Sequence, residues 1–152
     1  MAATITVRVQ PGVFDLAAET GHLKRLGGVG AVVTFTGVCR DEGGRLAALE
    51  LEHYPGMAES EIARIAREAA GRWPLIALTV IHRTGRIAVG DDIVLVATAS
   101  SHSEAAFAAA GFIMDFLKTE APFWKKEHKA HGATGDWVEA RNADDDAAER
   151  WR

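Results

Sequence analysis

The sequence is short of cysteine and of long apolar runs. Its 152 residues include a single cysteine, Cys39. One cysteine excludes an internal disulfide bond and is typical of a protein in a reducing compartment. No apolar run approaches the ~20 residues of a membrane-spanning helix, and the N-terminus lacks the pattern of a signal peptide. We therefore expect a cytoplasmic protein.

An excess of positive charge is also missing. The formal net charge is −4, and aromatic residues make up 7% of the chain. Proteins that bind nucleic acids need a basic face to displace counterions, and many expose aromatic rings that stack on bases. The composition therefore argues against general nucleic-acid binding.

What is present is the composition of one ordinary globular domain. Apolar residues make up 48% of the chain and charged residues 25%, as in most folded domains. A chain of this length can bury a substantial core. We assign residues 1–141 to a single domain and residues 142–152, which include three successive aspartates, to a polar C-terminal tail that is either frayed or docked.

The hydrophobic periodicity predicts an α+β fold with largely antiparallel sheets and two long helices. The long helices are expected at 57–73 and 103–120, each followed by a proline that cannot continue a helix. A shorter helix is expected to begin near Asp15. Alternating or apolar runs between glycine turns predict strands, at 5–9, 31–38, 45–53, 76–83, 86–89, 92–99, 123–129 and 137–140.

Three lysines surround the Pro-aromatic turn that follows the second long helix. Lys118 falls in the last helical turn, whereas Lys125 and Lys126 begin an extended segment. Because neighbouring strand residues face opposite ways, only one of these two can share a pocket with Lys118. The alternative is a solvated basic rim beside a packing corner, since lysines are mostly exposed.

Two further elements offer groups that bind anions. The strand at 92–99 runs into the helix at 103–120 through His102 and Ser103. A helix N-terminus presents free N–H groups and a positive dipole end, which favour a phosphate or carboxylate. Arg40 follows the strand at 31–38, and its planar guanidinium also suits an oxyanion.

Several segments in one order and spacing resemble the large, catalytic subunit of molybdopterin synthase, the MoaE family. They extend from about Val32 to Arg141, which is most of the chain. The matching segments are AVVTFTG at 31–37 with Arg40, LEHYPGM at 51–57, VIHR at 80–83, FIMD at 112–115, LK at 117–118, APFWKKE at 121–127 and WVEAR at 137–141. The resemblance implies an α/β-hammerhead fold, in agreement with the periodicity.

The resemblance also implies a sulfurtransferase of molybdenum cofactor biosynthesis. In that reaction two sulfurs pass to cyclic pyranopterin monophosphate and form the dithiolene of molybdopterin. The sulfur arrives as a thiocarboxylate on the C-terminal Gly-Gly of a small ubiquitin-like partner of the MoaD type. The large subunit is expected to form a homodimer, and a heterotetramer with its partner. No metal or redox cofactor is expected.

By the same resemblance, Lys118 and Lys125 are catalytic, as acid–base and electrostatic groups beside the thiocarboxylate. The residues expected to bind substrate are Val38, Cys39, Arg40, His102, Ser103, Lys118, Lys125, Lys126, Glu127 and Arg141. We interpret the histidines His22, His53 and His82 as structural or exposed.

Other interpretations of single residues remain open. Cys39 is a candidate sulfur-carrying thiolate, although a lone cysteine on a strand usually packs. His128 with His131 and Asp136 is a weak candidate for a metal site, because no further ligands accompany them. The aromatic pair Phe123 and Trp124 either walls the pocket or packs in the core.

Ser103 departs from the family, which usually has arginine at this position. Serine can donate a hydrogen bond but brings no charge and no bidentate fork. Either Arg40, Arg141 or a lysine compensates, or the chain is slower. The alternative function is therefore a catalytically impaired paralogue that binds the partner without performing the chemistry.

His102 and Lys118 lie at opposite ends of one predicted helix. Their separation of 16 residues corresponds to ~24 Å along the helix axis. A pterin monophosphate cannot bridge that distance. If both residues serve one site, they come from two copies of the chain across a two-fold interface.

Overall fold

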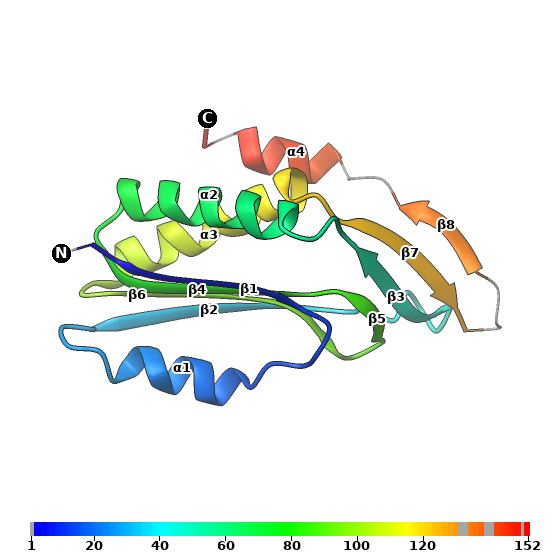
Figure 1. The fold of residues 1–152 in the computed structure, drawn as a ribbon, viewed down its shortest axis with the longest axis horizontal. Helices are drawn as coiled ribbons and strands as arrows, with labels where there is room; N and C mark the ends of the chain where they lie inside the picture. The colour runs from blue at the N-terminus through cyan, green and yellow to red at the C-terminus, as the bar shows by residue number, and fades with distance from the viewer. Residues whose placement is uncertain (1, 131–133, 139–141, 150) are drawn as a thin grey trace.

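The computed structural model describes residues 2–130, 134–138, 142–149 and 151–152 (Figure 1). Its elements in chain order are β1 (Thr4–Gln10), α1 (Leu16–Lys24), β2 (Ala31–Val38), β3 (Leu46–Glu52), α2 (Met57–Arg72), β4 (Leu75–Arg83), β5 (Gly85–Ala88), β6 (Asp92–Ser100), α3 (Ser103–Glu120), β7 (Trp124–Lys129), β8 (Thr134–Val138) and α4 (Asn142–Glu149). No helix in these ranges is long and apolar enough to cross a membrane.

The first sheet has the strand order β1-β4-β6-β2. Strand β1 pairs with β4 in parallel, and the β4–β6 and β6–β2 pairs are antiparallel. Helices α2 and α3 cover one face of this sheet and α1 covers the other (Figure 1). Because the central strands are covered on both sides, β4 and β6 are almost continuously buried rather than alternating.

The second sheet has the order β5-β3-β7-β8 and is antiparallel throughout the described strands. It extends beyond the helices at one end of the molecule (Figure 1). The chain passes from the first sheet to the second at Gly85, whose positive φ of 78° suits glycine. The predicted α+β fold with largely antiparallel sheets and two long helices is confirmed.

The main core lies between the first sheet and the helices α2 and α3. On α2, Ile62 and Ile65 are fully buried and form the apolar face of the helix. On α3, Phe112 and Ile113 are fully buried, whereas Phe107 is 66% exposed. Full burial of such side chains contributes roughly 1.5–3 kcal/mol each, so this face fixes where α3 sits on the sheet.

The C-terminal residues pack against α3. The indole N–H of Trp151 donates to Oδ2 of Asp115 at 2.6 Å, and its ring contacts Trp73 and Phe112 edge-on. Ala148 on α4 is buried in the main core. The end of the chain is therefore docked and contributes to the core, while a boundary at residue 141 stays a prediction.

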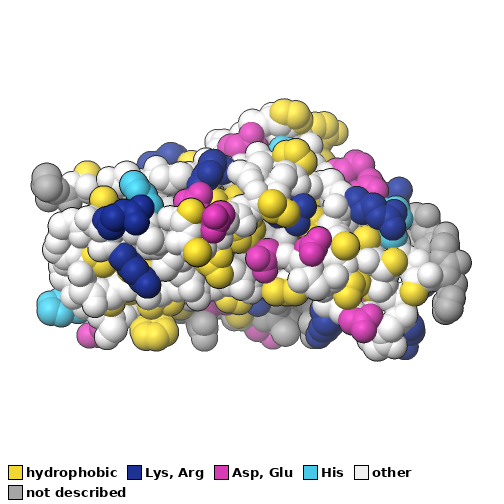
Figure 2. All heavy atoms as spheres, turned by 90° about the horizontal axis from the view of Figure 1, so that it is seen from below, with side chains coloured by type: hydrophobic (Ala, Val, Ile, Leu, Met, Phe, Trp, Pro, Cys, Tyr) yellow, Lys and Arg dark blue, Asp and Glu magenta, His cyan; other side chains and the backbone are white. Residues whose placement is uncertain are grey.

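Charges of both signs are distributed over the surface that carries α1. Acidic and basic side chains are interspersed there with apolar ones (Figure 2). This surface offers no single-sign field of the kind that steers a polyanion to a protein.

A close backbone approach fixes the turn before α3. A Cβ at Gly30 would lie 2.2 Å from the carbonyl oxygen of Ser101, a backbone atom that cannot rotate away. We expect Gly30→Ala to lower the free energy of unfolding by about 1–3 kcal/mol. Gly27→Ala is the control, because a Cβ there meets nothing within 4 Å. Urea titrations that gave equal stability for both variants would contradict this close approach.

Candidate functional site

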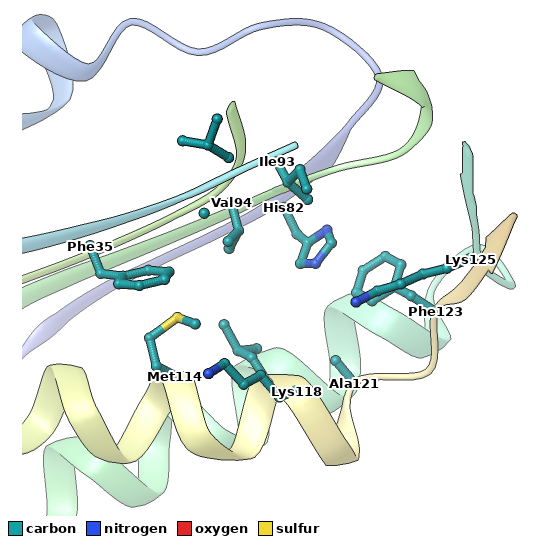
Figure 3. Close-up of a pocket in the computed structure, with 12 residues that line it drawn as sticks. Phe35, His82, Ile93, Val94, Met114, Lys118, Ala121, Phe123 and Lys125 are labelled. Atoms are coloured by element: carbon teal, nitrogen blue, oxygen red, sulfur yellow. The ribbon is translucent and has the colours of Figure 1, made fainter. Parts of the chain in front are cut away.

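A cavity of about 190 Å³ lies between the end of α3, the first sheet and the start of β7 (Figure 3). Among the described residues, three polar side chains line it, namely His82, Lys118 and Lys125. The apolar part of its wall includes Phe35, Val38, Val94, Met114, Leu117 and Phe123. The described wall thus combines cations with an apolar surface, which suits a narrow anionic ligand.

Two separate elements bring the lysines together. Lys118 lies in the last turn of α3, which ends at Glu120, two residues before Pro122. Lys125 is the second residue of β7 and pairs with Leu51 of β3. Both side chains extend into the space between α3 and the sheet (Figure 3). The prediction that one lysine of the 125–126 pair shares a pocket with Lys118 is therefore confirmed in its geometry.

Lys126 and Glu127 do not line this cavity. Lys126 pairs with Glu50 of β3, and the alternation of the strand turns it away from Lys125. Glu127 pairs with Leu49 and is half-buried in the second sheet. A role for either residue in substrate binding stays a prediction.

His82 is the polar residue of the pocket that the sequence interpretation missed. It lies on β4, is 8% exposed, and stacks on Phe123 with ring centroids 3.9 Å apart and planes 13° apart. Its Nδ1 lies 2.9 Å from the carbonyl oxygen of Arg83. The sequence alone indicates a structural or exposed histidine here. A histidine in an otherwise apolar strand is the signal that could have identified it.

Burial sets the charge state of His82. It lowers the pKa of the imidazole to about 4, since desolvation disfavours the cation more strongly than the hydrogen bond to Arg83 favours it. The charges of Lys125 and His53 lower this pKa further. The ring is therefore neutral at physiological pH.

The segment after β2 divides between the cavity, the core and the solvent. Val38 lines the cavity. Cys39 is 1% exposed, in a cluster with Leu46 and Ile87. Desolvation also raises the pKa of its thiol. The structure therefore gives the Cys39 side chain a packing role and not that of a reactive thiolate, because a thiolate needs exposure and nearby positive charge.

Arg40 lies on the surface, outside the lining of the cavity. Its side chain is 72% exposed and forms a 3.0 Å ion pair with Glu42. An exposed pair of this kind contributes little to stability, so the guanidinium can exchange Glu42 for another anion. Its role in substrate binding stays a prediction.

In the second sheet, a side-chain hydrogen bond joins β7 to β3. His128 Nε2 lies 2.9 Å from Oε1 of Glu50, and this hydrogen bond lowers the pKa of Glu50. Among the residues that the structure describes, no group of three or more potential ligands is arranged to hold a metal ion.

The predicted anion-binding residues at the start of α3 lie away from the cavity. His102 caps the helix with an extended backbone, and both His102 and Ser103 are exposed. Because α3 is a continuous helix of 18 residues, one chain cannot bring them beside Lys118. Arg141, the remaining predicted residue, lies outside the described residues.

An open apolar groove continues from the cavity along α3 and β2. Its lining includes Phe35, Phe107, Gly111, Met114 and Lys118. Phe35 is 38% exposed and Phe107 66%. Large apolar side chains that gather on one surface mark an interaction site more often than single ones do.

The sequence and the fold of this chain match those of a known protein family. The profile of the MoaE protein family matches residues 9–120. The molybdopterin synthase catalytic subunit of Rhizobium meliloti (strain 1021) is 64% identical over 152 residues, which cover 99% of this chain and 98% of the relative.

Solved structures of similar sequence have the same fold. The molybdopterin biosynthesis MoaE protein from Burkholderia ambifaria superposes with a TM-score of 0.83 and 50% identity, over 97% of this chain and 98% of that one. Molybdopterin synthase from Staphylococcus aureus gives a TM-score of 0.76 and 29% identity, over 90% and 96% of the two chains. With its lysine pocket, its two sheets and these relatives, the chain belongs to the MoaE family.

Proposed function

We propose that this chain is the catalytic subunit of a molybdopterin synthase. It transfers two sulfurs from a thiocarboxylated partner to cyclic pyranopterin monophosphate. The observation that carries this proposal is the convergence of Lys118 and Lys125, from α3 and β7, in one apolar-walled cavity. The family's catalytic subunits, such as that of Rhizobium meliloti, support the same reaction.

The two lysines suit the demands of this chemistry. A thiocarboxylate is an anion, and two ammonium groups beside an apolar wall attract it more strongly than they would in bulk water. As sulfur bonds to the pterin, negative charge develops on the oxygens that leave, and an ammonium can stabilise that charge or donate a proton. Lys118 and Lys125 fill these roles.

The cavity suits the end of the partner's chain. Its volume of about 190 Å³ is below the ~300 Å³ of typical small-molecule pockets. A Gly-Gly tail has no side chains and passes through a narrow opening that other residues cannot enter. The pterin then lies outside this cavity, with its reacting carbons towards the lysines.

A second copy of the chain completes the site. The groove with exposed Phe35 and Phe107 offers an apolar contact surface beside Lys118. A two-fold interface there brings the start of one α3 towards the end of the other, so that His102 and Ser103 of one copy reach the pterin phosphate held by its neighbour. Each copy binds one small ubiquitin-like subunit, which gives a heterotetramer in the cytoplasm.

The catalytic role of the lysines is tested by truncation. We expect Lys118→Ala and Lys125→Ala each to reduce molybdopterin formation at least about a hundredfold, the typical contribution of acid–base catalysis. Lys129→Ala is the matched control, an exposed lysine at the other end of β7. Thermal unfolding should be nearly unchanged, since truncation of exposed lysines costs little stability. If a variant keeps most of its activity, the lysine that it lacks is not catalytic.

The shared site is tested by mixing two inactive chains, His102→Ala and Lys118→Ala. In a heterodimer, one of the two sites is intact and the other carries both substitutions. Random exchange makes about half of the dimers heterodimeric, so roughly a quarter of wild-type activity should return. Subunit exchange without recovered activity would place both residues in one chain's site, or His102 outside it.

The serine at position 103, where the family usually has arginine, is the feature that raises the alternative of an impaired paralogue. If the start of α3 binds the substrate phosphate, Ser103→Arg should tighten pterin binding by roughly 1–3 kcal/mol, the gain of a charged hydrogen bond. Titration of the wild type and the variant with the pterin measures this difference. An unchanged affinity would mean that another cation already binds the phosphate group of the pterin.

A further inference from the structure

We propose that His82 is the hydrogen-bond acceptor of the lysine pocket and that it binds the last amide N–H of the partner's Gly-Gly tail. This inference rests on the proposed function and assigns the tail a contact opposite the lysines. It concerns a residue that lies in the cavity on a different element, β4, from those that carry Lys118 and Lys125.

The tautomer of His82 follows from the hydrogen bond that its Nδ1 makes. Nδ1 faces the carbonyl oxygen of Arg83 at 2.9 Å. A carbonyl oxygen can only accept, so Nδ1 carries the proton. In a neutral ring the other nitrogen, Nε2, then has a lone pair and can only accept. The ring is neutral because burial lowers the pKa of His82 to about 4.

Nε2 is available to a ligand. Among the described residues it has no hydrogen-bond partner. It is also not sealed in the core. Among the described residues, the one fully enclosed side-chain atom that lacks a hydrogen-bond partner is Oε1 of Glu59. The ring projects from β4 into the cavity (Figure 3). Nε2 is thus a fixed acceptor at the wall of the pocket.

The ring cannot easily turn away. Its stack on Phe123 and its bond to Arg83 fix both the plane and the rotation of the imidazole. A pre-organised acceptor loses little entropy when it binds, which makes its hydrogen bond more favourable.

The other polar side chains of the described cavity wall cannot accept a hydrogen bond. The ammonium groups of Lys118 and Lys125 are donors only. Among the described lining residues, the remaining side chains are apolar, with the Met114 thioether a weak acceptor. An extended glycine tail presents both kinds of group, an anionic end that accepts and a backbone N–H that donates. The lysines match the first and His82 the second.

The most direct test changes the ligand and leaves the chain intact. The small sulfur-carrier subunit is prepared by ligation in two forms, one ending in Gly-Gly and one in which the terminal glycine is replaced by glycolate. The ester oxygen removes the N–H donor and keeps the shape. Both forms carry an unreactive carboxylate, so that binding is measured without turnover. We expect the ester form to bind the wild-type chain about 3–10-fold more weakly, the loss of one net hydrogen bond.

Two variants complete a double-mutant cycle. His82→Asn keeps an N–H near Nδ1 for Arg83 but has no acceptor at the position of Nε2, whereas His82→Gln places an amide oxygen there. With the amide tail, His82→Asn should lose the same 3–10-fold and His82→Gln about twofold or less. With the ester tail, His82→Asn should lose nothing further.

Equal binding of the amide and ester tails by the wild-type chain overturns the proposal, whether or not the variants fold. The proposal is also overturned if the loss of affinity caused by His82→Asn multiplies with the loss caused by the ester. Independent losses would mean that His82 has a structural role and does not contact the amide. If the wild-type chain binds neither form, the proposed function itself fails, which separates the two conclusions.

Discussion

The packing of α3 on the first sheet is the constraint on which the site depends. Phe112 and Ile113 are fully buried there, and α2 and α4 hold the same helix from its other sides. A rigid helix anchored at its middle has both ends fixed in space. One end places Lys118 at the cavity, and the other presents His102 and Ser103 to the solvent.

The second constraint is the junction between α3 and β7. Pro122 cannot continue the helix, and the chain turns at once into a strand of the other sheet. Phe123 stacks on His82 and so ties this turn to β4. Lys125 follows two residues later, and strand alternation directs it into the cavity rather than away from it. The stack thereby links the position of one lysine to the core of the first sheet.

The electrostatics of the pocket are local. The chain carries a formal net charge of −4, yet the polar side chains of the described cavity wall are two cations and one neutral imidazole. Apolar neighbours such as Phe35 and Val94 lower the local dielectric constant, which strengthens the attraction of an anion. An acidic protein can therefore hold a small anionic group without attracting polyanions to its surface.

Much of the fold was predictable from the sequence because it depends on local periodicity. The apolar spacing of 57–73 and 103–120, the prolines after them and the glycine turns between strands predicted the first three helices and the strands within a few residues. The helix α4 was not predicted, because its segment reads as a polar tail. The pocket geometry was partly predictable for the same reason, since the alternation of Lys125 and Lys126 follows from strand geometry alone. The family resemblance supplied the chemistry expected of these lysines.

Other features were decided by contacts between residues far apart in the chain. The pattern around Cys39 and Arg40 is that of a strand end, and only the arrangement of the second sheet buries the thiol and leaves the guanidinium in solvent. Trp151 docks because Asp115 and Phe112 meet it on α3. By itself, the sequence determined the first three helices, the strands and the residues that could bind an anion. Tertiary structure decided which of them meet, because burial and hydrogen bonding of a side chain such as His82 depend on neighbours that local sequence does not specify.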